Sequence, residues 1–229
     1  MSLDIGVVMD PIAHIKPWKD TTLSLLLEAQ RRGWRLHYME PGDLYVRDGR
    51  PLATTRPLRV EDNNDHWFEL GDATRTSLPD LDMILMRQDP PFNAEYIYAT
   101  YILEKAERER ALVVNRPGSV RDSNEKLFAT DFPQCCVPTL VSGRADQLRA
   151  FVAEFNDIVM KPLDAMGGAN IFRVSKDSPN TSVIIEVLTD HGRTPIMAQQ
   201  FIPEITSGDK RILMINGEPV PYALARIPK

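Results

Sequence analysis

The sequence predicts two domains, an open parallel α/β domain over residues 1–120 and an α+β domain over residues 121–229. The first prediction depends on an N-terminal strand, helix and strand, because this order at short spacing is typical of a right-handed parallel βαβ unit. The second depends on pairs of β-prone runs joined by short glycine-bearing turns, which indicate antiparallel hairpins. With 229 residues, 43% of them hydrophobic, the chain is long enough to build a sizeable core in each domain.

In the first domain, residues 4–9 and 35–39 are the strands of the βαβ unit. Between them, Asp20 is the expected N-cap of a helix over residues 21–32, which Gly33 ends. We expect the remaining segments to be a hairpin at 44–60, a polar excursion at 61–78, a strand at 81–86, a helix at 95–110 and a strand at 112–115.

For two of these segments the sequence predicts more detail. The excursion at 61–78 is polar and is expected to decorate the domain, with Trp67 and Phe68 anchoring it. The helix at 95–110 is expected to carry Ile97, Tyr101 and Leu103 on its inner side.

The second domain is expected to begin with a short helix that Asp122 or Ser123 caps and that contains Lys126. A later helix is expected to be capped at Ser178, with Pro179 as its first residue. Strands are predicted at 139–141, 158–160, 171–174, 196–201, 210–215 and 219–226, a further helix at 146–155, and a two-residue turn at Asn216–Gly217.

Composition excludes several classes of function. The net charge of −5 and the pI near 5.4 argue against nonspecific nucleic-acid binding. No apolar run is long enough to span a bilayer, and the N-terminus lacks a signal-peptide pattern, so we expect a cytoplasmic protein that binds no membrane. Cys135 and Cys136 are adjacent and are expected to be free thiols, and the four histidines show no ligand spacing, so no metal site is predicted.

The stretch V-M-K-P-L-D-A-M-G-G-A-N-I-F-R-V at 159–174 predicts a phosphate-covering hairpin. Lys161 follows a short strand, and Gly167 and Gly168 occupy the loop before the next one. Adjacent glycines let backbone N–H groups approach an anion closely, and a lysine adds a point charge for phosphate. An ordinary tight turn with a surface lysine fits the bare pattern equally well.

A charged segment at a strand end predicts a second ligand-binding site, at the edge of the sheet. Arg87 and Asp89 directly follow the strand at 81–86, and Asp10 follows the first strand. A proline-stiffened loop in which Arg87 pairs with Asp89 is the alternative interpretation, and a helix-approach or turn role is the alternative for Asp10.

Six motifs occur in order along the chain: M-D-P-I at 9–12, M-R-Q-D-P-P-F at 86–92, R-D-S-N-E-K at 121–126, K-P-L-D-A-M-G-G at 161–168, G-D-K-R at 208–211 and A-R-I-P at 225–228. Together they closely resemble the bacterial glutathione synthetases, which are ATP-grasp ligases. The resemblance implies a pre-ATP-grasp domain followed by an ATP-grasp domain. It also implies a cytoplasmic homotetramer that joins γ-glutamylcysteine and glycine through an acyl phosphate, giving glutathione, ADP and phosphate.

Several residues match motif positions that contact ATP in this family. The resemblance implies that Lys126 and Lys161 approach the phosphates, with Gly167 and Gly168 in a mobile flap. Cations and oriented N–H donors are needed there because an anionic carboxylate attacks an anionic γ-phosphoryl group.

A second set of matched positions surrounds the nucleoside. Residues Gln199, Gln200, Phe201 and Ile202 resemble the linker whose backbone contacts the adenine edge, and Asp209 resembles the acid that accepts from ribose hydroxyls. The family commonly has asparagine and tyrosine where this chain has Gln200 and Phe201, so the side-chain contacts there differ.

The remaining matched positions concern the reacting groups and the dipeptide. Arg211 and Arg226 resemble guanidinium clamps for the acyl phosphate, and cross-strand charge pairing is their alternative role. Arg87 and Asp89 match a segment that faces the dipeptide substrate, with Asp10 as a further candidate. No residue is assigned as a general base.

The family binds magnesium or manganese through carboxylates and an asparagine that follow a Gly-rich loop. No such cluster closes this sequence, so metal ligands are expected beyond residue 229 and the ATP-grasp domain is expected to be incomplete. We accordingly expect residues 226–229 to end beside an incomplete nucleotide cleft, and the 229 residues alone to have little ligase activity.

Two other functions remain compatible with the sequence. One is another ATP-grasp carboxylate-amine ligase, which would share the lysines and the flap but not the M-R-Q-D-P-P-F stretch. The other is a module that binds ATP without catalysing ligation.

Overall fold

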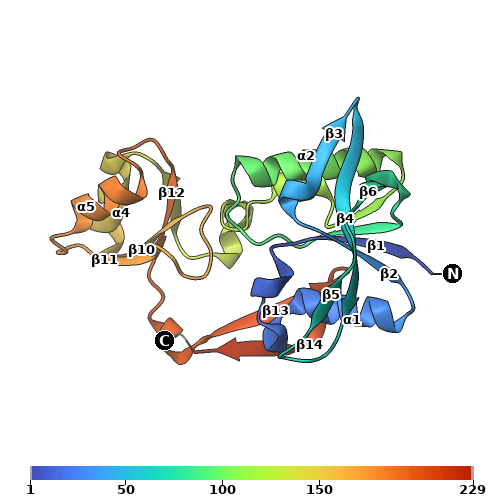
Figure 1. Cartoon of the computed structure of the whole chain (residues 1–229). Coiled ribbons are helices and arrows are strands. Elements are labelled where there is room, and N and C mark those ends of the chain that lie inside the picture. Colours follow the sequence, from blue (N-terminus) through green and yellow to red (C-terminus); the bar gives the residue numbers. More distant parts are fainter. Residues whose placement is uncertain (1, 228–229) are drawn as a thin grey trace. The chain divides into compact units, whose positions relative to one another are not determined.

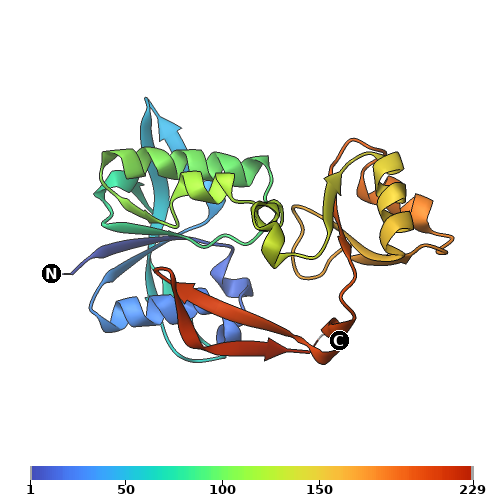
Figure 2. The same cartoon turned by 180° about the vertical axis from the view of Figure 1, so that it is seen from behind.

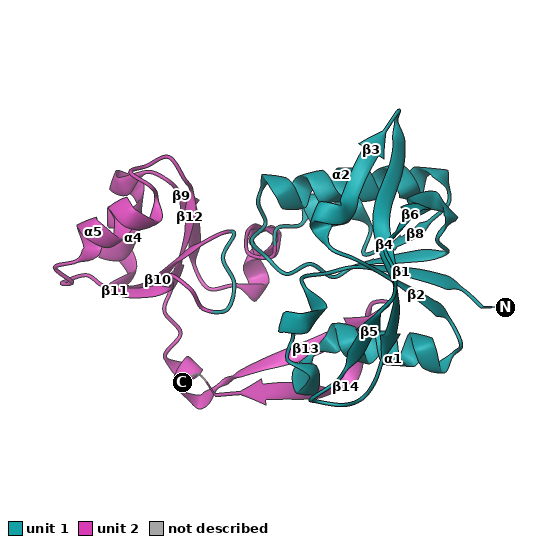
Figure 3. Ribbon diagram, viewed as in Figure 1, with its two compact units in different colours: residues 1–124, 164–167 teal, residues 125–163, 168–229 magenta. Residues whose placement is uncertain are grey.

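The computed structural model describes residues 2–227, and its elements are shown in Figure 1. The chain divides into two compact units (Figure 3). The first comprises residues 1–124 together with 164–167, and the second comprises residues 125–163 and 168–229. Pro228, the last residue of the A-R-I-P motif, and Lys229 lie outside the described residues, and so does the predicted environment of the chain end.

The first unit is built on an eight-stranded sheet with a parallel centre. Its strands follow the order β3-β4-β2-β1-β7-β8, and β5 and β6 both pair with β4. The strands are β1 (Asp4–Val8), β2 (Arg35–Met39), β3 (Leu44–Arg47), β4 (Arg50–Val60), β5 (Phe68–Leu70), β6 (Thr74–Ser77), β7 (Met83–Met86) and β8 (Leu112–Val114). Because β2, β1, β7 and β8 are parallel, the predicted parallel α/β core is confirmed.

The prediction that residues 61–78 only decorate the domain is wrong. This segment supplies β5 and β6, which pair antiparallel with β4 at Leu58↔Leu70 and Thr54↔Arg75. The reason is the length of β4, whose 11 residues extend beyond its pairing with β2 and leave backbone groups that need partners.

Two helices cover opposite faces of this sheet, α1 (Thr21–Arg31) and α2 (Ala94–Glu109) (Figure 1). The Asp20 carboxylate accepts a hydrogen bond from Leu23 N at 2.7 Å, which confirms the predicted N-cap. A third helix, α3 (Pro117–Asp122), ends where the sequence suggested a start, since Pro117 is suited to a first helical turn. Lys126 therefore precedes a short 3-10 segment, Leu127–Asp131, and is not inside a helix.

The inner face of α2 differs in part from the prediction. Leu103 is fully buried, but the Tyr101 side chain is 50% exposed and lies beneath the Arg121 guanidinium at 4.3 Å. Helical spacing of three and four residues places a different set on the inner face. That set is Tyr96, Ala99, Thr100, Leu103 and Ala106.

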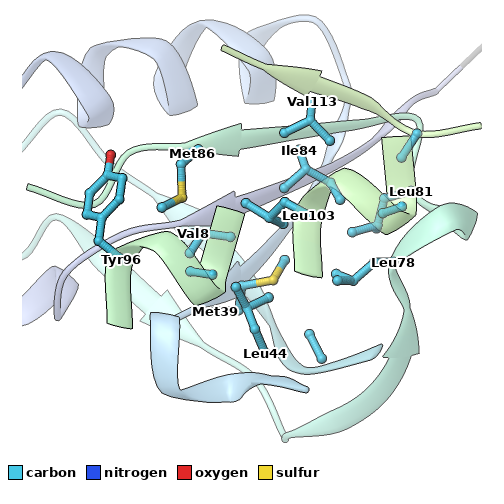
Figure 4. Packing of buried hydrophobic residues seen from close by; sticks show 14 residues of the cluster. Val8, Met39, Leu44, Leu78, Leu81, Ile84, Met86, Tyr96, Leu103 and Val113 are labelled. Atoms are coloured by element: carbon cyan, nitrogen blue, oxygen red, sulfur yellow. The ribbon is translucent and has the colours of Figure 1, made fainter. Parts of the chain in front are cut away.

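Side chains along β1 point alternately to the two faces of the sheet, and a hydrophobic cluster lies on each face. Val8 packs with Met39, Ile84 and Leu103 on one face, as Figure 4 shows, whereas Ile5 and Val7 pack on the other. Gly6 occupies a tight position on β1, because a Cβ there would approach Leu81 Cδ1 to 2.8 Å. Close strand packing therefore requires glycine at this position.

The second unit contains a four-stranded antiparallel sheet in the order β11-β10-β12-β9. The strands are β9 (Thr139–Ser142), β10 (Asp157–Pro162), β11 (Phe172–Ser175) and β12 (Ile196–Gln200). Helices α4 (Ala145–Phe155) and α5 (Thr181–Leu188) lie together on one face, as Figures 1 and 2 both show. The cluster that they cover includes Leu148, Phe151, Ile158, Met160 and Ile185.

The predicted start of α5 is two residues early. The helix begins at Thr181, and the Ser178 carbonyl accepts hydrogen bonds from the Thr181 amide and hydroxyl in the preceding turn. The final hairpin is confirmed, with β13 (Asp209–Ile215) paired to β14 (Glu218–Arg226). Asn216 and Gly217 both have positive φ, 52° and 83°, as a two-residue turn of this type requires.

Within the described residues, no helix has the length and apolar character needed to cross a membrane.

Candidate active site

A pocket of about 420 Å³ lies in the second unit on the sheet face opposite α4 and α5. Strand alternation explains its composition, because Ile158 and Met160 face the core while Val159 and Lys161 line the pocket. The pocket is lined by Val137, Val159, Lys161, Ile171, Arg173, Gln199, Gln200, Phe201, Ile202 and Ile205. An apolar slot with the cations Lys161 and Arg173 on its wall suits a planar ring that carries anionic groups.

Lys161 is one of the two cationic side chains that line this pocket, and its environment disfavours its charge. Burial lowers the pKa of its ammonium group, and the charge of nearby Lys126 lowers it further. Lys126 in turn donates to the Glu125 carboxylate at 2.8 Å and to the Leu163 carbonyl at 3.5 Å. The structure therefore brings the two predicted phosphate lysines close enough to repel each other, which an anion bound between them would reverse.

Gly167 and Gly168 form the tip of the loop between β10 and β11. Both have positive φ, 68° and 84°, and a Cβ built on either would meet no atom within 4 Å. The left-handed backbone, and not crowding, is thus what favours glycine here.

Some of the linker residues at the end of β12 already form hydrogen bonds within the chain. The Gln200 amide donates to the Pro138 carbonyl and the Phe201 amide donates to the Asp157 carbonyl, each at 3.0 Å. The Gln199 side chain donates to Thr139 Oγ1 at 2.9 Å. Ile202 is left as the linker residue whose N–H has no hydrogen bond within the described part of the chain.

Arg173 fixes the Phe201 ring at the pocket wall. Its guanidinium lies 3.7 Å from the ring centroid, and it also forms a two-point ion pair with the Asp157 carboxylate. Val137, Val159, Ile171, Arg173 and Ile205 line the pocket but were missed as site residues. Strand alternation beside Lys161 could have indicated Val159, whereas the others come from different elements.

Asp209 and Arg226 pair with each other on the final hairpin. They are direct cross-strand neighbours, and Arg226 Nε donates to Asp209 Oδ1 at 2.9 Å while a second guanidinium nitrogen bonds the other oxygen. This pairing, with a smaller effect from Arg211, lowers the pKa of the Asp209 carboxyl. The alternative of cross-strand charge pairing thus describes the observed contacts of Arg226, and the proposed contacts of these three residues with ribose and acyl phosphate stay predictions.

In the first unit, the carboxyl ends of β1 and β7 bring Asp10, Arg87 and Asp89 together. The Arg87 amide donates to the Val8 carbonyl and the Asp89 amide donates to Asp10 Oδ2, both at 2.7 Å. The Asp10 carboxylate therefore holds the loop after β7, and its contact with substrate stays a prediction. Arg87 Nε donates to Thr22 Oγ1 at 3.0 Å, and within the described residues Arg87 forms no ion pair with Asp89.

A pocket of about 590 Å³ opens at this strand edge. It is lined by Met86, Arg87, Gln88, Asp89, Tyr96, Asn115, Arg116, Ser119, Val120 and Ser123. Burial, followed by the Asp10 charge, raises the pKa of the Asp89 carboxyl, and Arg87 opposes this effect. Asn115 and Arg116 were missed, although they follow β8 and parallel strands present their carboxyl ends at one edge.

Residues 2–227 include no group of three or more His, Cys, Asp or Glu side chains that could hold a metal ion. None of these residues is therefore assigned as a metal ligand.

Both units of the chain match domains of known proteins. Residues 3–121 match the prokaryotic glutathione synthetase N-terminal domain, and residues 125–229 match the prokaryotic glutathione synthetase ATP-grasp domain. The chain belongs to the prokaryotic glutathione synthetase family. The predictions of the family and of an ATP-dependent ligase are confirmed.

Curated relatives support the same conclusion. The chain is 59% identical over 228 residues to the glutathione synthetase of Pseudomonas aeruginosa, which covers 100% of this chain and 72% of the relative. It is 58% identical to the glutathione synthetase of Yersinia pestis, with 99% of this chain and 71% of the relative covered.

Solved structures bear on the fold alone. The D-cycloserine synthetase DcsG aligns with a TM-score of 0.64 at 14% identity, over 99% of this chain and 75% of that one. D-alanyl-alanine synthetase A from Vibrio cholerae aligns with a TM-score of 0.61 at 12% identity, over 99% and 68%. The predicted fold class, a pre-ATP-grasp domain followed by ATP-grasp architecture, is confirmed.

Proposed function

We propose that this chain serves the ATP-dependent synthesis of glutathione from γ-glutamylcysteine and glycine. Family membership supports the overall reaction. The observation that carries the proposal is Lys161, a half-buried cation on the pocket-facing side of β10, beside an apolar slot of about 420 Å³. Among the substrates of this reaction, ATP is the one that combines a planar base with a chain of phosphates.

The pocket residues fit ATP in two respects. Val159, Ile171 and Ile202 offer apolar walls to the adenine ring, and the Ile202 N–H is available to a ring nitrogen. Lys126 and Lys161 offer two cations to the phosphates, supported by the backbone of the loop that carries Gly167 and Gly168. Gln199, Gln200 and Phe201 complete the linker that we assign to the nucleoside, and Asp209 is assigned to the ribose.

The chemistry requires a phosphoryl transfer followed by an acyl transfer. A cysteinyl carboxylate oxygen attacks the γ-phosphorus and ADP leaves, and the glycine amine then attacks the acyl carbon and phosphate leaves. In the first step Lys126 and Lys161 offset the repulsion between the two anionic reactants. We assign Arg211 and Arg226 to the transferring phosphoryl oxygens, for which Arg226 exchanges its contact with Asp209.

The first unit is assigned to the dipeptide. Arg87 and Asp89 line the pocket at the strand edge, and Asp10 fixes the loop between them through the Asp89 amide. We propose a domain division into a substrate domain at 1–120 and an ATP-grasp domain at 121–229.

The family resemblance also supports magnesium or manganese as the divalent cofactor, a homotetramer, and a cytoplasmic location. The metal would offset phosphate charge, and no residue of the described chain is assigned to it. Light scattering coupled to gel filtration tests the tetramer, for which we expect four times the subunit mass.

The reaction is tested by incubating the full protein with ATP, Mg²⁺, γ-glutamylcysteine and glycine, while both ADP and glutathione are measured. We expect equal amounts of ADP and glutathione, and neither product when γ-glutamylcysteine is omitted. ATP binding without ADP formation would identify a non-catalytic module. ADP formation that depends on a different amine would identify another ATP-grasp ligase.

A further inference from the structure

The first unit contains a further pocket, of about 750 Å³, that has no role in the proposed reaction. It lies on the neighbouring strands β3, β4 and β6 (Figure 1), and we call it the β4 pocket. It shares no lining residue with the pockets assigned to ATP and to the dipeptide. Most of its lining residues are charged, which indicates a charged ligand, and these residues are Arg47, Asp48, Arg50, Arg75 and Asp80.

Strand pairing places the three arginines on one side of this sheet. Arg47 and Arg50 are direct partners across β3 and β4. Arg75 of β6 is the partner of Thr54, which points to the same face as Arg50 because side chains alternate along β4. The opposite face is covered, since Ala53 is buried in the hydrophobic cluster that includes side chains of α2. The three guanidinium groups therefore extend from the solvent-facing side.

Arg47 and Arg50 form a like-charge pair. The Cβ atoms of direct cross-strand partners lie about 5 Å apart, and like charges at such positions destabilise a sheet. Arg47 Nε lies 3.7 Å from the Asp48 carboxylate, but both side chains are largely exposed, so this contact compensates little. A carboxylate bound between the two guanidinium groups would remove the repulsion and accept charge-assisted hydrogen bonds from both.

Other charges of the β4 pocket have no partner within the described protein. The side chains of Arg50, Arg75 and Asp80 form no hydrogen bond or ion pair with any residue of 2–227. Most other arginines in that range bond to a carboxylate. Charges of opposite sign that line one pocket without pairing fit a ligand that carries both signs.

The charges are grouped at two ends of the pocket. The end of the β3–β4 hairpin carries Arg47, Asp48 and Arg50. Asp80 follows the end of β6 that lies nearest to this part of β4. Arg75 lies at the other end, four residues of β4 away from Arg50, which is about 13 Å at 3.3 Å per residue.

This grouping indicates the shape of the ligand. The hairpin end offers guanidinium and carboxylate groups together, which fits an amino-acid head group with its carboxylate and ammonium. The Arg75 end fits a second carboxylate, and the half-buried Leu52 between the two ends offers an apolar contact. Three extended residues span about 10 Å, and the long arginine side chains bridge the remaining distance, so the length matches a tripeptide.

The linkage of the peptide follows from the head group. In an ordinary α-linked peptide, the carbon that bears the terminal ammonium carries no carboxylate. In a γ-glutamyl peptide the same carbon carries both groups, and the other end of the peptide has a carboxylate of its own. The charges of the β4 pocket therefore favour a γ-glutamyl tripeptide.

We propose that the β4 pocket is a ligand site separate from the two assigned above, and that it binds a γ-glutamyl tripeptide. Arg47 and Arg50 hold the α-carboxylate of the glutamyl head, and Asp80 accepts a hydrogen bond from its ammonium group. Arg75 holds the carboxylate at the other end. The choice of glutathione as this tripeptide rests on the proposed function, of which it is the product.

The test follows the methyl resonances of Leu52 by NMR while glutathione is added to the full protein. Leu52 lines the β4 pocket and neither of the other two pockets, so its signals report on this site. We expect a saturable shift. A glutaryl analogue that lacks only the ammonium group should bind about 10-fold more weakly, and so should pyrophosphate, a simple anion. Leu52 signals that do not move, or that respond equally to either alternative ligand, would overturn the proposal.

Arg50→Gln and Arg75→Gln assign the binding to this pocket. Each should raise the dissociation constant for glutathione about 10-fold, the lower end for a hydrogen bond to a charged group, because both arginines are exposed. Arg50→Gln should melt no lower than wild type, because it removes the repulsion with Arg47. Arg110→Gln is the matched control, since it removes another exposed arginine of the first unit whose side chain has no partner within 2–227. Unchanged glutathione affinity in both test variants would contradict the assignment.

The outcomes distinguish this proposal from the proposed function. A protein that forms glutathione but whose Leu52 signals do not respond to it overturns the β4 pocket as a ligand site and leaves the reaction intact. A protein that forms no glutathione but whose Leu52 signals respond overturns the proposed function, while the ligand site stands.

Discussion

Replacing Lys161 with methionine tests the nucleotide pocket most directly. Lys161→Met removes the positive charge from the pocket-facing side of β10 but keeps an unbranched side chain. The neighbouring Ile158 and Met160 face the opposite side and are unaffected. We expect ATP binding to weaken and glutathione formation to slow, because the variant has one cation fewer for the phosphates.

The size of the effect follows from the environment of Lys161. A hydrogen bond to a charged group contributes about 1.5–3 kcal/mol, which corresponds to a rise of about 10- to 100-fold in the dissociation constant for ATP. Turnover should fall further, by about 100-fold or more, if Lys161 also stabilises charge that moves during phosphoryl transfer.

Unlike ATP affinity, the thermal stability of the folded protein should not fall in Lys161→Met. The pKa of Lys161 in the folded chain lies below its ordinary value of 10.5, so the unfolded chain binds this proton more tightly. The charge therefore opposes folding at neutral pH, and this opposition disappears as the pH rises to 10.5. We expect Lys161→Met to melt at the same temperature as wild type or higher at pH 7, with the difference lost at alkaline pH.

Calorimetry with ATP, a coupled ADP assay and thermal melting measure the three effects. Lys176→Met is a suitable control, because Lys176 is an exposed lysine of the same unit, directly after β11. Unchanged ATP affinity and ADP formation in a folded Lys161→Met protein would refute the assignment of this pocket to ATP.

Three further predictions concern the other charged groups. Arg87→Ala should raise the KM for γ-glutamylcysteine about 10- to 100-fold and leave ATP affinity unchanged in kinetic and calorimetric assays; the reverse pattern would contradict it. Arg226→Ala should slow glutathione formation and let the pKa of Asp209 rise toward 3.8 in an NMR titration; an unshifted Asp209 would argue against their pairing in solution. Asp4→Asn should lower the melting temperature at pH 7 and by much less at pH 2, because Arg35 holds the pKa of Asp4 at about 2. The stabilisation is complete above pH 3.8 and lost as the pH falls through 2, so an equal loss at both pH values would contradict this mechanism.

Local signals predicted the parts of the fold that are determined by neighbouring residues. Asp20 caps α1, and Asn216–Gly217 closes the final hairpin, because cap and turn geometry depend on a few adjacent side chains. The prediction for the segment at 61–78 was wrong because its structure depends on residues distant in the sequence. Strands β5 and β6 pair with parts of β4 that would otherwise lack partners. The polar sequence of the segment itself does not indicate how long β4 is or which of its residues need partners.

The residues of the candidate site likewise fall into those that local sequence predicted and those that it did not. Lys161 was found because a lysine beside a loop with adjacent glycines is a local pattern that suits phosphate, and the family motif at 161–168 favoured this interpretation over an ordinary turn. Val137, Ile205 and Arg116 were missed because their residue types are common and only the tertiary fold brings them to a pocket.

Strand β10 shows why stability and function are separable in this pocket. Its alternation sends Ile158 and Met160 into the hydrophobic cluster and Val159 and Lys161 into the pocket. A shift of one residue in its pairing with β12 would exchange the two sets, placing the lysine in the core and the isoleucine in the pocket. The hydrophobic cluster therefore fixes the register that positions Lys161, even though none of its side chains lines the pocket.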